Sequence, residues 1–275
     1  MLGHKLLQGW SKEEELWTTL RRGRADYPGF GSIASGRLVE GIDVTNGEAL
    51  LSVFRKARPE AVVNCVGVIK QKEEAKHALT SIGINSLFPH RLAEICALAG
   101  ARLVHISTDC VFSGNRGKYK ETDLSDAEDL YGRTKFLGEL HDQHCVTLRT
   151  SIIGRELGTR SGLIEWFLSQ QGQQIRGYRR AIYTGFTTLE LSRIILDVLR
   201  RRTDISGLWQ VSSDPITKFD LLMSARQPLG WNGEIVPFDD FHCDRSLDST
   251  RFREATGYRP PSWDAMLAEM AADVI

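Results

Sequence analysis

The stretch AVVNCVGVI, residues 61–69, is short, continuous and apolar, and its valines and isoleucine are β-branched. Runs of this kind are typical of a strand that is buried on both faces of a parallel sheet. Two further runs, ARLVHIS (101–107) and CVTLRTSII (145–153), have the same character, and helical patterns at 84–99 and 131–141 separate the three. This alternation predicts an α/β fold: a doubly wound parallel sheet with helices on both faces.

Upstream of this region the pattern continues. Leucines and tryptophans recur near helical spacing over residues 3–22, which predicts an amphipathic helix. A short strand is expected at 37–44 and a helix at 47–56, so strand and helix alternate here as well.

Downstream of residue 154 the pattern is less regular, with helices expected at 163–170 and 188–202 and a strand at 207–213. We therefore expect two parts. Residues 1–153 would form the domain that contains the parallel sheet, and residues 154–275 a smaller C-terminal lobe, from which residues 188–211 pack back on the sheet.

The composition limits the classes of partner. The 275-residue chain has 35 basic and 35 acidic residues, so its net charge of zero gives no reason to expect nucleic acid or an acidic membrane surface. No apolar run approaches the ~20 residues of a membrane span, and residues 1–17 lack the apolar core of a signal peptide. The five cysteines are scattered and lack metal-ligand spacing. We expect a cytoplasmic protein with reduced thiols and no metal, membrane or nucleic-acid partner.

Tyr131-Gly-Arg-Thr-Lys135 is the first candidate for chemistry. Residues four apart on a helix share a face, so the phenol and the ammonium would point the same way. A free tyrosine, with a pKa near ~10, is a poor acid at neutral pH, and a nearby ammonium lowers that pKa. The pair could then give a proton to a carbonyl oxygen. Alone, the motif is also compatible with an incidental pair on a surface helix.

A second candidate, HISTDCVFSG (105–114), begins where a predicted strand ends. Ser107 or Thr108 could hydrogen-bond a substrate carbonyl and fix its geometry. The alternative is a turn in which these side chains bond the local backbone. The two candidates together occur in the order strand, polar loop, helix and strand.

Several blocks now carry a resemblance to a known family. STDCVFSG (107–114), YGRTKFLGE (131–139) and LRTSIIG (148–154) resemble the corresponding blocks of the dTDP-4-dehydrorhamnose reductase family, within the extended short-chain dehydrogenases/reductases. Further similar blocks are GIDVTN (41–46), RPEAVVNCVG (58–67), GINSLFPHRLAE (83–94) and SLDSTRFREATGYRPPSW (246–263). The resemblance spans essentially the whole chain, and it implies a Rossmann-like fold, with residues 1–153 as the dinucleotide-binding domain and residues 154–275 as the substrate-binding lobe.

The resemblance also implies roles for particular residues. Tyr131 matches the family's catalytic acid, and Lys135 matches the lysine that lowers its pKa and bonds the nicotinamide ribose. Thr108 matches the hydroxyl that holds the substrate carbonyl, and Asp109 lies beside it. The implied reaction transfers a hydride from NADPH or NADH to C4 of a nucleotide-linked keto-sugar, with a homodimer as the candidate assembly.

The remaining cofactor contacts follow from the same match. Asp43 and Val44 fall where the family holds the adenine end of the cofactor. Val66, Gly67 and Val68 fall at the strand end that lines the nicotinamide side.

The sequence departs from the family at its start. The family opens with a buried strand and a Gly-x-x-Gly-x-x-Gly turn, which lets the backbone approach the cofactor pyrophosphate. Here Gly3 matches the third glycine, and the strand and the first two glycines are absent from this sequence. We expect a start at an internal methionine of a longer reading frame; the alternative is a shorter protein with impaired cofactor binding. Loss of a central strand would expose two neighbouring strand edges.

The second departure lies at Ile152, where the rhamnose reductases carry a tryptophan against the sugar. The sugar or its pose is therefore left open. A sugar-nucleotide epimerase on the same fold is an alternative, whereas Cys110 stands where dehydratases need a carboxylate. A non-catalytic, cofactor-binding or regulatory subunit is the third hypothesis.

Overall fold

The computed structural model describes residues 1–10, 14–27, 37–70, 73–158 and 161–273. Its central sheet has the strand order β10-β5-β4-β3, and all neighbouring pairs are parallel. The strands are β3 (Ala61–Asn64), β4 (Arg102–Ile106), β5 (Cys145–Arg149) and β10 (Gly207–Gln210). The predicted α/β fold with a parallel sheet is confirmed.

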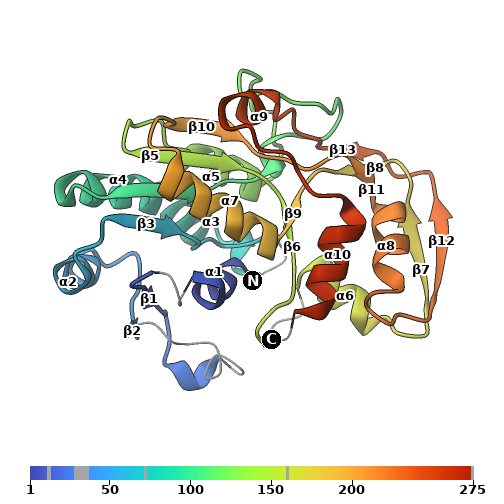
Figure 1. The fold of residues 1–275 in the computed structure, drawn as a ribbon, viewed down its shortest axis with the longest axis horizontal. Helices are drawn as coiled ribbons and strands as arrows, with labels where there is room; N and C mark the ends of the chain where they lie inside the picture. The colour runs from blue at the N-terminus through green and yellow to red at the C-terminus, as the bar shows by residue number, and fades with distance from the viewer. Residues whose placement is uncertain (11–13, 28–36, 71–72, 159–160, 274–275) are drawn as a thin grey trace.

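Helices cover both faces of this sheet (Figure 1). On one face, Val104 of β4 and Val146 of β5 share a core with α1 (Leu2–Trp10) and α7 (Thr188–Arg201). On the other face, Leu103 and Cys145 pack against α4 (Phe88–Ala99). Successive residues of a strand point to opposite faces, so one apolar run supplies both cores.

The N-terminal strands lie apart from the central sheet. Two short parallel strands, β1 (Trp17–Thr19) and β2 (Arg37–Val39), pair only with each other. Among the described residues, no strand joins β1 to β3, so each of these two strands has an edge without a partner strand.

Two predictions about this region were wrong. The helix expected over residues 3–22 ends at Trp10, and Trp17 lies in β1; residues 11–13 lie outside the described part. The run 61–69 forms a strand only to Asn64, and Val62 and Val63 are half-buried rather than fully buried. The reason is the unpaired edge of β3, which lacks a neighbour to complete its burial.

The C-terminal half is divided between the sheet and a separate lobe. α7 packs on β4, and β10 pairs with β5, so this part of the chain belongs to the central sheet. The lobe contains α6 (Leu163–Ser169), β7 (Gln174–Tyr178), β8 (Ala181–Tyr183), β11 (Ile216–Thr217), α8 (Lys218–Arg226), β12 (Glu234–Phe238), β13 (Cys243–Asp244) and α10 (Trp263–Ala272). Figure 1 places β7 and β12 at the end of the molecule opposite α2 (Gly47–Ala57) and α4.

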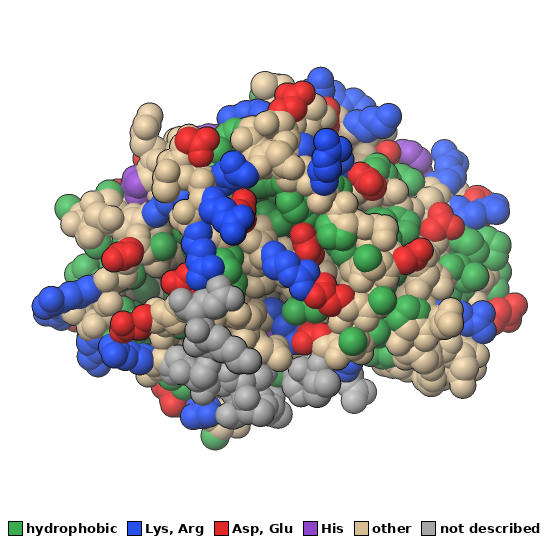
Figure 2. All heavy atoms as spheres, viewed as in Figure 1, with side chains coloured by type: hydrophobic (Ala, Val, Ile, Leu, Met, Phe, Trp, Pro, Cys, Tyr) green, Lys and Arg blue, Asp and Glu red, His purple; other side chains and the backbone are tan. Residues whose placement is uncertain are grey.

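The surface carries charges of both signs. Figure 2 shows lysines and arginines interspersed with acids over the visible face, in keeping with the zero net charge. Among the described residues, none of the helices combines the length and the apolar character that a membrane crossing requires.

Candidate active site

The site is built at the carboxyl ends of β4 and β5, where ligands of open α/β sheets bind. Thr108 lies two residues beyond the end of β4 and caps a short 3-10 turn, η5 (Asp109–Val111). Its hydroxyl accepts a hydrogen bond from the Cys110 backbone N–H at 3.1 Å and donates one to Asp109 Oδ1 at 3.1 Å. Thr108 therefore bonds the local backbone, as the alternative interpretation of this segment predicted. The same bonds hold its side chain in one orientation at the strand end.

Helix α5 (Leu130–Leu137) brings the tyrosine and the lysine to this turn. It begins at Asp129, whose carboxylate accepts from the Gly132 backbone N–H at 2.8 Å and caps the helix. The helix lies so close to η5 that a Cβ on Gly132 would be 2.2 Å from the Cys110 carbonyl oxygen. Only glycine permits this approach. Helix α5 ends at Leu137, before the predicted end at His141, because the Gly138 N–H donates to the Lys135 carbonyl and closes the helix.

Tyr131 and Thr108 are brought together. The Thr108 hydroxyl lies close enough to the Tyr131 phenol to favour the phenolate. Burial has the larger influence, however, and it raises the pKa of Tyr131 above its usual value. A low-dielectric surrounding disfavours the charged phenolate, so the phenol keeps its proton at neutral pH.

Lys135 is 5% exposed, and its ammonium donates to the Ile106 carbonyl at 2.7 Å. Burial lowers the pKa of Lys135 to about 8, while the nearby Glu139 carboxylate opposes this change. We expected Lys135 to lower the pKa of Tyr131; in the structure the ammonium binds the end of β4, and burial dominates the pKa of the phenol.

The loop after β3 contains the residues expected on the nicotinamide side. Val66 and Gly67 are exposed, and Val68 is buried. Asn85 holds this loop, because its side chain accepts from the Val68 N–H at 2.8 Å and donates to the Val68 carbonyl at 3.0 Å. Asn85 lies in a π-helical turn (Ile82–Leu87), a feature that is frequent at functional sites. The sequence analysis did not identify Asn85. The signal that could have found it is a polar amide inside an apolar helical pattern.

The other predicted contacts are spread along the same edge. Gly3 lies in α1, where its added Cβ would be 3.8 Å from Cys65 at the end of β3. Asp43 is exposed and accepts from the Thr45 N–H and hydroxyl at 2.9 and 2.7 Å, bonds that lower the pKa of this carboxyl. Val44 packs partly buried beside α2, and Ile152 lies in the two-residue strand β6 (Ile152–Ile153). The described hydrogen bonds join none of these four residues to Thr108 or Tyr131.

A cavity of about 210 Å³ opens beside the site, with Cys110, Asn115, Asp129 and Arg245 in its wall. The Arg245 guanidinium donates to the Phe112 carbonyl at 2.8 Å and contacts Cys110 Sγ at 3.9 Å. The sequence analysis did not identify Arg245 either. More than a hundred residues separate it from Cys110 in the sequence, so no local pattern indicates the contact.

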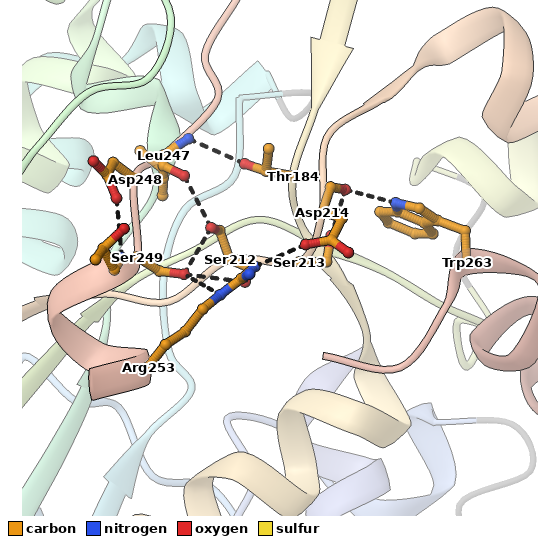
Figure 3. A network of polar contacts seen from close by, with 10 residues as sticks. Thr184, Ser212, Ser213, Asp214, Leu247, Asp248, Ser249, Arg253 and Trp263 are labelled. Atoms are coloured by element: carbon orange, nitrogen blue, oxygen red, sulfur yellow. Dashed lines mark hydrogen bonds and ion pairs between the residues drawn. The ribbon is translucent and has the colours of Figure 1, made fainter. Parts of the chain in front are cut away.

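A polar network holds the C-terminal segment that carries Arg245 (Figure 3). Ser212, after β10, donates to the Leu247 carbonyl at 2.9 Å, and the Leu247 N–H donates to Thr184 Oγ1 at 3.2 Å. Arg253 of α9 (Thr250–Thr256) donates to the Ser212 carbonyl and to Asp214, each at 3.1 Å. The network thereby fixes residues 247–249, which follow Arg245 closely in the chain, beside the end of β10.

Comparisons with known proteins agree with this arrangement. A model of the family described as RmlD substrate binding domain matches residues 1–225. The chain is 35% identical over 99 residues to dTDP-4-dehydrorhamnose reductase of Streptomyces griseus, covering 36% of this chain and 33% of that protein. It is 24% identical over 262 residues to dTDP-4-dehydrorhamnose reductase of Aggregatibacter actinomycetemcomitans, covering 84% of this chain and 87% of that protein.

Among solved structures, the Bordetella bronchiseptica enzyme WbmG in complex with NAD and UDP superimposes with a TM-score of 0.79 at 17% identity, covering 99% of this chain and 91% of that one. This likeness confirms the Rossmann-like fold. The chain spans about a third of the length of the Streptomyces relative. Because the family model matches 225 of the 275 residues, the chain belongs to the RmlD substrate binding domain family.

Proposed function

We propose that this chain is an NAD(P)H-dependent reductase that transfers a hydride to the C4 keto group of a nucleotide-linked deoxy-sugar. The names of its relatives, dTDP-4-dehydrorhamnose reductase, support this reaction. One observation carries the proposal: Thr108 and Tyr131 lie together at the carboxyl end of β4, with the Lys135 ammonium buried behind them. This arrangement suits proton donation to a carbonyl oxygen.

In this proposal Tyr131 is the catalytic acid. Burial keeps its phenol protonated at neutral pH, so it can donate as charge develops on the carbonyl oxygen. Thr108 would hold that oxygen by a second hydrogen bond, and Asp109 and Ile152 would contact the sugar. Lys135 would favour the phenolate that remains after proton transfer and would bond the cofactor ribose.

The residues present fit a nicotinamide dinucleotide. α1 begins beside the end of β3, so the N–H groups of its first turn lie near the exposed Val66 and Gly67. Asp43, exposed after β2, would hold the adenine end together with Val44. The cofactor, NADPH or NADH, would supply the hydride.

The remaining expectations belong to the same proposal. Residues 1–153 would bind the cofactor, and residues 154–275 would bind the nucleotide-sugar, with α7 and β10 returned to the sheet. We place the protein in the cytoplasm and consider a homodimer as its assembly.

A non-catalytic, cofactor-binding or regulatory subunit is the second candidate function. The separate β1–β2 sheet favours it, because part of the phosphate-binding edge is not continuous with the central sheet. The epimerase alternative is not favoured, since the Streptomyces griseus and Aggregatibacter actinomycetemcomitans relatives are named as reductases.

The test measures oxidation of NADPH and of NADH at 340 nm with a dTDP-4-keto-6-deoxy-sugar as substrate. Tyr131→Phe should lower kcat by at least about 100-fold, because it removes only the acidic hydroxyl. Tyr178→Phe in β7, at the far end of the lobe, is the matched control and should retain normal activity.

Near-normal turnover by a folded Tyr131→Phe protein would refute the assignment of the acid. If the wild-type chain binds either cofactor in calorimetry but reduces no keto-sugar, the non-catalytic role is favoured instead.

A further inference from the structure

A buried ion pair lies behind Lys135. Glu139 is 5% exposed and accepts from Arg149 Nε at 2.7 Å and from Arg149 Nη2 at 2.6 Å. Arg149, at the end of β5, is 2% exposed, and its guanidinium stacks on the Phe112 ring at 5.2 Å. A third donor, the Ser107 hydroxyl, reaches Glu139 at 2.7 Å. This bidentate, buried geometry holds the Glu139 carboxylate in one orientation.

The pair is linked to Lys135 in two ways. Ser107 is the neighbour of Ile106, whose carbonyl accepts from the Lys135 ammonium at 2.7 Å, so Glu139 fixes the strand end on which the ammonium rests. Glu139 also follows Lys135 by four residues, and its negative charge favours the ammonium, which burial alone disfavours.

Other titratable groups lie on the elements packed around Lys135: Tyr131 on α5, His105 on β4, Asp109 and Cys110 in η5, Arg149 on β5 and His90 on α4. Burial lowers the pKa of His105 well below its usual value, so this imidazole is neutral at pH 7 and above. Burial raises the pKa of Asp109 and of Cys110. Glu139 is therefore the carboxylate that compensates the charge of Lys135.

We propose that Glu139, held by Arg149 and Ser107, is a positioning residue that keeps Lys135 charged and in place on the Ile106 carbonyl. The proposal deepens the proposed reductase function, in which a charged Lys135 favours the tyrosinate. Arg149 has the opposite effect on the charge of Lys135, because it is a second cation bound to the same carboxylate.

The test follows the Lys135 ammonium directly, by NMR of protein labelled with [ζ-¹⁵N]lysine, and its signal is assigned through its loss in Lys135→Met. Glu139→Gln should lower the titration midpoint by roughly one pH unit, and Arg149→Met should raise it. The double variant Glu139→Gln/Arg149→Met should fall between Glu139→Gln and the wild type. If Glu139→Gln fails to fold, the double variant decides, since a neutral replacement of a buried ion pair is generally tolerated.

Once turnover can be measured, the alkaline limb of the pH profile of kcat/KM should shift among these variants in the same order as the Lys135 titration midpoint. A purely structural role for Glu139 would not move the two single variants in opposite directions. An unchanged midpoint in the double variant, or shifts of the same sign in both single variants, would overturn the proposal. If the midpoints follow the expected order while no variant, wild type included, reduces a keto-sugar, the reductase assignment fails and the role of Glu139 in holding Lys135 stands.

Discussion

Gly132 offers a test of the close contact between α5 and η5. Within a helix, alanine is favoured over glycine by up to about 1 kcal/mol, so helix propensity alone predicts that Gly132→Ala is stabilising. The structure predicts the reverse, because the new Cβ would be 2.2 Å from the Cys110 carbonyl oxygen and 2.6 Å from Ala127 Cβ. Neither neighbour is the end of a flexible side chain.

The magnitude follows from this overlap. Real Cβ atoms essentially never approach other heavy atoms closer than 3.0 Å, so the helix must retreat from 2.2 Å, by roughly 0.8 Å. Overpacking of this kind costs about 3 kcal/mol at the upper end of the usual range. After the propensity gain, Gly132→Ala should reduce the free energy of unfolding by about 2 kcal/mol. The retreat would also move Tyr131 from Thr108 and cost roughly 100-fold in turnover.

Urea denaturation of the wild type, Gly132→Ala and Gly47→Ala would measure the effect. Gly47 is the matched control, because it is also helical and its added Cβ meets nothing within 4 Å. Gly47→Ala should stabilise the protein by roughly 0.5 kcal/mol. If Gly132→Ala is as stable as the wild type, α5 does not pack on η5 as described, and the placement of Tyr131 beside Thr108 is wrong.

Two further outcomes are expected. Burial lowers the pKa of His105 well below 6.5, so below pH 6.5 the unfolded chain binds a proton that the native state excludes. The free energy of unfolding should therefore fall by up to about 1.4 kcal/mol per pH unit of acidification. Urea titrations between pH 5 and 7 should show a shallower slope in His105→Gln, and an equal slope would contradict this. Arg253→Ala should cost about 1–3 kcal/mol by removing its bonds to Ser212 and Asp214 (Figure 3), whereas the control Arg201→Ala, on a side chain 78% exposed, should change little.

Local chemistry made several elements predictable. The run 101–107 formed β4, because its β-branched and apolar residues supply both faces of a buried strand. The helix at 47–56 formed as α2, and its start follows from Asn46, whose side chain accepts from the N–H groups of Glu48 and Ala49. The roles of Thr108, Tyr131 and Lys135 stay predictions, although the structure places the three at one strand end.

Other properties depend on contacts that are distant in the sequence. The helix expected at 3–22 ended early because helical periodicity cannot distinguish a continuing helix from a turn into β1. Val62 and Val63 read as buried, yet their burial depends on a neighbouring strand and not on their own composition.

The sequence by itself determined the alternation of strands and helices, the parallel sheet and the spacing that puts Tyr131 and Lys135 on one helix face, since these depend on residue type and local periodicity. Only the tertiary structure decided which groups surround that face. Burial sets the protonation of Tyr131 and Lys135, and the Glu139–Arg149 pair and Arg245 reach the site from separate elements. Solvation and long-range charge pairing arise only when the chain is packed, so the sequence pattern cannot contain them.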